Sequence, residues 1–281
     1  MGFVEITDKL MDISVKSFIT HKRGETDEDI QDSISIDLER GRFAVSDGVT
    51  NSFLPDILSR LLTRSYVAAA NNDAFPSLSF PEQFKEERDR YMNSLDDEKQ
   101  MLMEMVEEEF HVAGATFAGL TVNDNVFSWQ VLGDSCLFIV PEDGRLRCFC
   151  SMPVRISPEW LLDVDFDNHP SQIHSDGKVY GEWTKGKRTI TSGWIVLATD
   201  AVSAWFVDQH TEGNNPITQL WALNDNDEFE QFVENEYRAG RLKSDDESVV
   251  ILNIGTPNEC AEPNDQSDQS DLSDLSERPE L

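Results

Sequence analysis

The alternation of apolar and polar residues predicts an antiparallel hairpin near the start of the chain. Residues 11–20 alternate, as a half-buried strand does. Residues 33–37 alternate again, and Arg40-Gly41 is typical of a turn. The apolar run at 42–46 predicts the return strand, so residues 33–46 should fold back on themselves.

Helical periodicity follows the hairpin. Asn51 and Ser52 are suitable N-caps, and apolar residues between Phe53 and Tyr66 recur at helical spacing. After a linker, residues 81–110 predict one long amphipathic helix whose other face is acidic. Three shorter helices are predicted nearer the C-terminus, at 200–210, 217–223 and 228–239.

Between the helical blocks the pattern changes to short strands joined by tight turns. Residues 151–187 are less regular and predict a surface flap. Residues 188–191 and 193–199 predict a second hairpin, and 248–254 predict a buried closing strand. The central strands are predicted at 115–122, 126–132, 136–140 and 146–150.

The chain is strongly acidic. Its 54 acidic and 23 basic residues give a formal net charge of −31. This charge argues against nucleic acid and anionic membrane surfaces as partners and is compatible with a basic partner segment. Residues 256–281 repeat Ser and Asp without apolar periodicity and predict a disordered tail. A solvating appendage is the simplest interpretation of this tail, and a docking or phosphorylation segment is the alternative.

The cysteines and the N-terminus indicate a cytoplasmic protein. Cys148 and Cys150 share one face of a predicted strand, but no second pair stands at zinc-ligand spacing and no disulfide framework is evident. Buried, reduced thiols are therefore predicted for the four cysteines. The N-terminus has no signal-peptide pattern, and no apolar run is long enough to predict a membrane span.

Four aspartates flank the predicted core strands. Asp47, followed by Gly48, ends the second arm of the hairpin, and Asp32 lies at the same open end. Asp200 follows a later buried run, and Asp245 precedes the closing strand. A carboxylate beside a core strand is costly unless something binds it. Oxygen ligands from several strand ends suit Mn²⁺ or Mg²⁺, so the pattern predicts a hard-metal site.

Six short motifs follow one another along the chain: QDS at 31–33, SDG at 46–48, GATFAGL at 114–120, GDSCLF at 133–138, ATDA at 198–201 and SDDESVVIL at 244–252. Their order resembles that of a known family, the metal-dependent Ser/Thr protein phosphatases of type 2C, and its divergent bacterial branch in particular. The resemblance covers residues 11–255. It implies an α+β fold in which a two-sheet antiparallel β-sandwich is flanked by helices, in four αββα layers over residues 1–255.

The resemblance also implies a role for each acidic residue and a pair of Mn²⁺ or Mg²⁺ ions as cofactors. Asp47 would bridge the two ions, and the Gly48 carbonyl would bind one of them. Asp200 and Asp245 would hold the other ion. Asp32 would orient the attacking water.

A third ion is implied at Asp134 in the GDS motif, where a plain Gly-Asp turn is the alternative interpretation. The residues that handle phosphate depart from the family. Asp27 stands where the family usually has an Arg. Arg23, together with Lys22, is then the candidate phosphate ligand. His21 is the candidate to protonate the leaving group, in place of the family's usual His.

Three functions stay open at this point. The first is hydrolysis of phosphoserine or phosphothreonine in proteins by a water activated between two metal ions. The second is a catalytically impaired phosphatase-like module that binds a phosphoprotein or a regulatory partner. The third is a Ca²⁺-stabilised β-sandwich with no phosphate chemistry.

Overall fold

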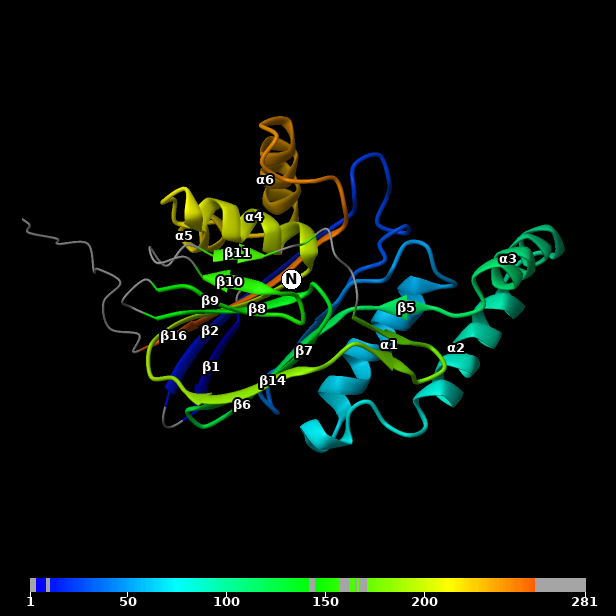
Figure 1. Ribbon diagram of the computed structural model, residues 1–281, viewed down its shortest axis with the longest axis horizontal. Helices are drawn as coiled ribbons and strands as arrows, with labels where there is room; N and C mark the ends of the chain where they lie inside the picture. Colours follow the sequence, from blue (N-terminus) through cyan, green and yellow to red (C-terminus); the bar gives the residue numbers. More distant parts are fainter. Residues whose placement is uncertain are drawn as a thin grey trace, which may run out of the picture.

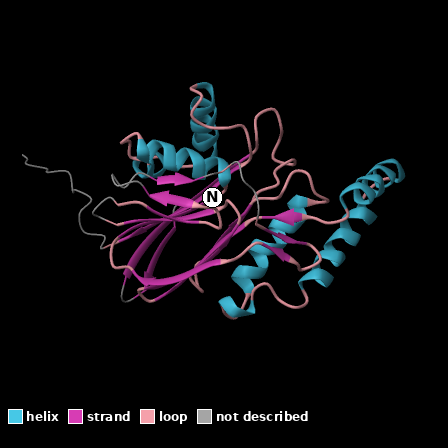
Figure 2. Cartoon of the chain, in the orientation of Figure 1, coloured by secondary structure: helices cyan, strands magenta, loops and turns pink. Residues whose placement is uncertain are grey.

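The computed structural model describes residues 4–8, 11–141, 145–156, 162–164, 166 and 171–255. Within them, two antiparallel sheets pack face to face and helices cover both outer faces (Figures 1 and 2). This is the four-layer α+β sandwich that the family resemblance implies. No helix in these ranges is long and apolar enough to cross a membrane. The predicted tail at 256–281 lies outside the described residues.

The first sheet, sheet A, has six strands. Its central strands β15 and β16 are almost entirely buried, as expected for apolar runs covered on both faces. In spatial order the strands are β1 (Val4–Asp8), β2 (Met11–Thr20), β16 (Glu247–Ile254), β15 (Gly193–Ala198), β8 (Cys136–Val140) and β9 (Arg147–Phe149).

The second sheet, sheet B, has five strands and contains the predicted hairpin. Ser33 pairs with Ser46, so Asp32 and Asp47 flank the open end of the hairpin, as predicted. In spatial order the strands are β14 (Thr184–Thr189), β7 (Val126–Leu132), β6 (Phe117–Asn123), β4 (Arg42–Ser46) and β3 (Ser33–Asp37).

Sheet B is covered by α1 (Pro55–Ala68), with α2 (Phe80–Ser94) packed on it and α3 (Asp97–Phe110) beyond (Figure 1). The prediction of one helix over 81–110 is wrong. Leu95 is extended, and the Asp96 side chain accepts a hydrogen bond from Lys99 N at 2.9 Å. A side-chain cap therefore starts a new helix where periodicity alone would continue the first one.

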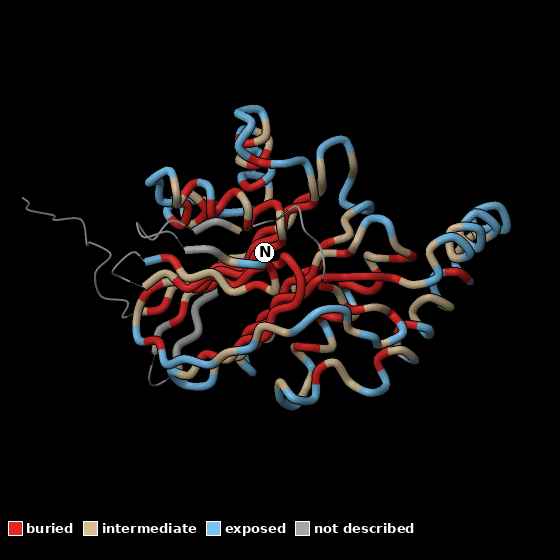
Figure 3. Tube along the Cα trace, viewed as in Figure 1, coloured by how far each residue is buried: buried red, intermediate tan, exposed pale blue. Residues whose placement is uncertain are grey.

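Helices α4 (Asp200–Thr211), α5 (Pro216–Trp221) and α6 (Asn226–Arg238) lie over sheet A (Figure 1). Aromatic pairs attach them to the strands. Phe138 of β8 stacks on Phe206 of α4, and Phe18 of β2 stacks on Phe229 of α6, with ring centroids 4.7 and 5.4 Å apart. The buried residues concentrate between the sheets and beneath these helices (Figure 3).

The predicted hairpin of residues 188–191 and 193–199 is also wrong. Strand β14 pairs with β7 in sheet B, whereas β15 pairs with β16 and β8 in sheet A. The chain therefore changes sheets between the two strands. Gly193 lies at this crossing with φ +114°, and a Cβ there would meet Val140 O at 2.6 Å. Only glycine fits this position without strain.

Residues 151–187 contain short strands where an irregular flap is predicted. A hairpin of β10 (Val154–Ile156) and β11 (Leu162–Val164) forms a separate two-stranded sheet. Strand β12 (Gln172–His174) pairs with both β13 (Val179–Tyr180) and β5 (Gly114–Ala115). The sheet of β12, β13 and β5 helps to position Asp47 and Gly48, because β5 also forms backbone hydrogen bonds with the loop after β4.

Candidate metal centre

The ends of strands from both sheets meet at one edge of the sandwich. Asp32 precedes β3 and Asp47 follows β4 in sheet B, whereas Asp200 follows β15 and Asp245 precedes β16 in sheet A. A hydrogen bond joins the two sides, because Thr199 Oγ1 donates to Asp32 Oδ2 at 2.8 Å. Asp32 of sheet B therefore lies against the end of β15 in sheet A, directly before Asp200.

The backbone around Gly48 is fixed by β5. Thr116 N donates to Asp47 O, and Val49 N donates to Gly114 O, both at 2.9 Å. These two bonds flank the isolated bridge between Gly48 and Ala115. In such an antiparallel pair the enclosed residue turns its own N–H and C=O away from the partner strand. The Gly48 carbonyl is therefore available to face a ligand.

Glycine is also required at position 48 by close packing. A Cβ there would lie 2.8 Å from Gln31 O and 2.8 Å from the backbone of Pro55. Both neighbours are main chain, so neither can move aside cheaply. The Asp47-Gly48 pair thus combines a carboxylate with a close backbone approach.

Asp134 and Asp200 both lie where the chain passes between two elements. Asp134 lies in the connection from β7 of sheet B to β8 of sheet A and is only 2% exposed. Asp200 is the first residue of α4, where its Oδ1 accepts a hydrogen bond from Ala201 N at 2.7 Å. The positive end of the helix dipole favours a negative charge at Asp200.

The electrostatics of the cluster are those of crowded, buried carboxyls. Burial raises the pKa of Asp32 well above its ordinary value, and repulsion from Asp246 and Asp200 raises it further. Burial likewise raises the pKa of Asp47. Repulsion from four other aspartates adds to this shift: Asp200, Asp32, Asp134 and Asp245. The other four predicted aspartates are thus close enough to Asp47 to oppose its ionisation.

Sequence reasoning missed two acidic neighbours of Asp245. Asp246 is buried and accepts hydrogen bonds from Lys22 N at 2.9 Å and Gln31 N at 2.7 Å, so it ties the loop before β3 to β16. Glu247 is 2% exposed, and its Oε2 has no hydrogen-bond partner. Burial, with repulsion from Asp32, raises the pKa of Glu247 to about 10. The signal was the run of three acids directly before a buried strand.

The donor set fits divalent hard cations. Buried carboxyls that repel one another, with an unsatisfied Glu247 oxygen beside them, would be stabilised in their charged form by a bound cation. In the described part of the chain, no three of these carboxylates bring one oxygen each within 4.8 Å of the others. A site for two ions about 3.5–4 Å apart is wider than a one-ion site, and Mg²⁺ keeps several water ligands.

Arg23, the predicted phosphate ligand, lies against α6. Its Nε is 3.6 Å from Glu234 Oε2, and its guanidinium lies 4.8 Å from the Tyr237 ring centroid. Lys22 Nζ pairs with Glu25 at 3.3 Å, and His21 Nδ1 lies 3.0 Å from Lys22 O. Contact between these residues and phosphate stays a prediction.

The chain was compared with protein-family models, curated proteins and solved structures. No protein-family model matches the chain, and no curated protein matches its sequence. Among solved structures, the catalytic domain of serine threonine protein phosphatase PstP, in complex with two manganese ions, matches with a TM-score of 0.51 at 15% identity. The match covers 88% of this chain and 100% of that one.

Two other solved phosphatase structures match the fold of this chain to a similar degree. Serine/threonine phosphatase Stp1 from Staphylococcus aureus matches with a TM-score of 0.53 at 11% identity, over 89% of this chain and 97% of that one. A bacterial serine phosphatase gives a TM-score of 0.51 at 11% identity, over 85% and 97%. The chain therefore has the type 2C fold of the bacterial serine/threonine protein phosphatases.

Proposed function

We propose that this protein is a metal-dependent phosphoprotein phosphatase that hydrolyses phosphoserine and phosphothreonine. The observation that carries the proposal is the meeting of strand ends from both sheets: Asp32 and Asp47 from sheet B, Asp200 and Asp245 from sheet A. The fold supports it, since a neighbour of the same fold is in complex with two manganese ions.

The residues that would hold Mn²⁺ or Mg²⁺ are those predicted from the motifs. Asp47 would bridge two ions, the Gly48 carbonyl would bind one, and Asp200 with Asp245 would bind the other. Asp134 is the candidate ligand of a third. When bound, the ions would supply the positive charge that offsets the phosphate oxygens and acidifies a water.

Asp32 would act on the water rather than hold the substrate. Its Oδ2 accepts the hydrogen bond from Thr199, which would hold the carboxylate in place to orient a water and take its proton. Because Asp32 is buried between the two sheets, its position is set by the packing of both. Thr199 is then a positioning residue for this step.

The substrate class follows from charge and from the fold. A body this acidic favours phosphorylated protein segments that carry basic residues and disfavours nucleic acid. Arg23 would have to leave Glu234 to reach a phosphate. We expect the protein to act in the cytoplasm.

Hydrolysis of p-nitrophenyl phosphate and of a phosphoserine peptide tests the proposal. We expect turnover with Mn²⁺, none with EDTA, and a loss of about 100-fold or more in Asp47→Asn. The matched control is Asp124→Asn, a turn residue with φ 52° that asparagine also tolerates. Turnover that survives EDTA, or equal activity of the two variants, would refute the assignment.

One observation favours a second candidate, a catalytically impaired module that binds a phosphoprotein or a regulatory partner. Asp27 stands where the family usually has the phosphate-binding Arg, and Arg23 is engaged with α6. This candidate predicts that Mn²⁺ binds in calorimetry and is lost in Asp47→Asn, while no substrate is turned over. Ca²⁺ stabilisation equal to that of Mn²⁺ in a thermal melt would instead indicate a structural ion.

A further inference from the structure

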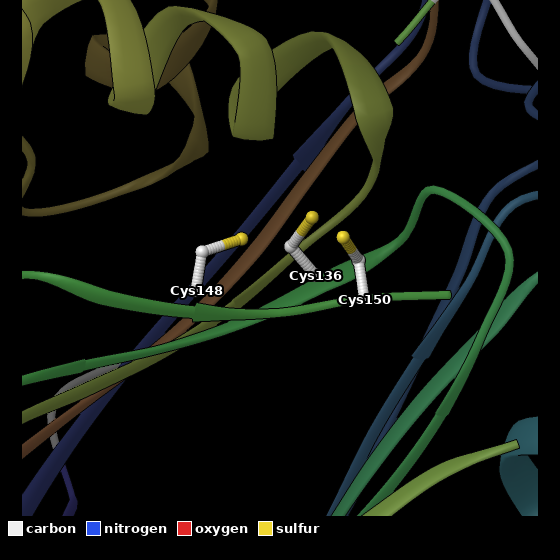
Figure 4. Close-up of side chains that lie close together, drawn as sticks. All are labelled: Cys136, Cys148 and Cys150. Atoms are coloured by element: carbon white, nitrogen blue, oxygen red, sulfur yellow. The ribbon is translucent and has the colours of Figure 1, made fainter. Parts of the chain in front are cut away.

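Three cysteines converge on the outer face of sheet A (Figure 4). Cys136 begins β8, Cys148 lies in β9, and Cys150 directly follows β9. Their Sγ atoms all lie within 4.8 Å of one another. All three are free thiols.

The register of β8 and β9 explains the convergence. Phe138 pairs with Cys148 and Leu137 with Phe149, so the next position brings Cys136 opposite Cys150. Side chains two residues apart share a face of a strand, which puts all three sulfurs on one side. Phe138 stacks on Phe206 of α4, and this shows that the shared face is the one under α4.

The three sulfurs form a cluster of soft ligands. Cys136 and Cys150 are buried, and Cys148 is half-buried. Cys136 Sγ donates to Asp134 O at 3.2 Å, and Cys150 Sγ donates to Met152 O at 3.7 Å. Among the described residues, no His, Asp or Glu side chain joins this group of ligands.

We propose that Cys136, Cys148 and Cys150 form a three-thiolate site for a soft cation of the Cu(I) class. Metal–sulfur bonds of about 2.3 Å in a trigonal plane put the sulfurs about 4 Å apart, so the observed spread needs only small side-chain rotations. Thiolates select soft metals. Zn²⁺ almost always takes four ligands in structural sites, and the group has three.

This site is distinct from the carboxylate centre in ligand type. Hard Mn²⁺ and Mg²⁺ prefer the oxygens of the aspartates, and a soft cation prefers the sulfurs. The proposal therefore does not depend on the phosphatase assignment. The three-cysteine site is tested by measuring copper binding, and the copper affinity of Asp47→Asn should equal that of the unchanged protein.

The test is a Cu(I) titration of the reduced, full-length protein against a chromogenic Cu(I) chelator, without oxygen. We expect one tightly bound Cu(I) per chain and affinity at least about 100-fold weaker in Cys148→Ser. Cys148 is half-buried, so its replacement should leave the fold intact, which circular dichroism checks. Cys260→Ser removes the fourth cysteine, which lies outside the described residues, and is the matched control.

Two further measurements make the result decisive. X-ray absorption of the copper complex should show three sulfur neighbours. Cys136→Ala should weaken binding as much as Cys148→Ser, because the site uses all three sulfurs. Cu(I) affinity that is unchanged in Cys148→Ser, or that falls only in Cys260→Ser, would overturn the proposal.

Discussion

Replacing Thr199 by Val tests how the two sheets are joined at the carboxylate edge. The Thr199 hydroxyl donates to Asp32 Oδ2 at 2.8 Å and accepts a hydrogen bond from Ser248 N at 3.1 Å. Thr199 N in turn donates to Ser248 O at 3.1 Å, just beyond the last paired residues of β15 and β16. The Thr199 hydroxyl therefore accepts the Ser248 N–H hydrogen bond that a backbone carbonyl would otherwise accept. Valine keeps the shape of the side chain and removes both hydroxyl bonds.

The size of the effect follows from these contacts. Losing the bond to Asp32 costs about 1 kcal/mol, the usual net contribution of one hydrogen bond within a protein. The Ser248 N–H is left unpaired at a buried position, which costs about 1–3 kcal/mol. We therefore expect Thr199→Val to lower the free energy of unfolding by about 2–4 kcal/mol.

Urea unfolding followed by fluorescence measures this difference. Thr189→Val, at an exposed position on β14, is the control and should change the stability by less than about 0.5 kcal/mol. A loss in Thr199→Val as small as the control's would refute the bridging role. If Mn²⁺ ionises Asp32, the gap between the unchanged protein and Thr199→Val should widen in Mn²⁺, since charge-assisted hydrogen bonds are stronger.

Two other predictions follow from particular contacts. Gly48→Ala should abolish Mn²⁺ stabilisation in a thermal melt, because the added Cβ would meet main-chain atoms at 2.8 Å. The control is Gly255→Ala, whose Cβ would meet nothing within 4 Å, so this variant should melt like the unchanged protein. Equal Mn²⁺ responses of the two variants would contradict the prediction. Glu236→Gln should cost about 1.5–3 kcal/mol at pH 7 in urea unfolding, because Arg241 donates to that carboxylate at 2.7 and 2.6 Å and Trp205 donates at 2.9 Å. These bonds, led by those from Arg241, lower the pKa of Glu236, so its stabilisation is complete above the ordinary value of 4.5 and is lost as the pH falls through the lowered value. The loss in the free energy of unfolding caused by Glu236→Gln should therefore shrink in acid. A loss that is constant with pH would contradict the assignment, and so would an equal loss in the control Glu230→Gln, at an exposed position of α6.

Local patterning predicted much of the carboxylate edge. Alternation predicted the first arm of the hairpin and an apolar run predicted the second, and the register placed Asp32 and Asp47 at its open end. Apolar runs marked β15 and β16, so Asp200 and Asp245 were recognisable as strand-end residues. In each case the signal was a change of pattern within a few residues of the site.

Features set by long-range pairing could not be predicted in the same way. The strands that end at Thr189 and begin at Gly193 look like a hairpin, but each pairs with strands distant in sequence. The cysteine cluster is different: its strands were predicted at 136–140 and 146–150, but the exact β8–β9 register that brings Cys136 and Cys148 together was not. The break at Asp96 was missed because a side-chain cap competes locally with helix continuation.

The placement of acidic ligands on two different sheets has a consequence for folding. A partly folded chain in which only the 33–46 hairpin had formed would carry Asp32 and Asp47 without Asp200 and Asp245. Cation affinity would then appear only when the two halves of the sandwich dock. In a refolding experiment, the onset of Mn²⁺ binding would thus time the docking step itself, separately from the formation of either sheet.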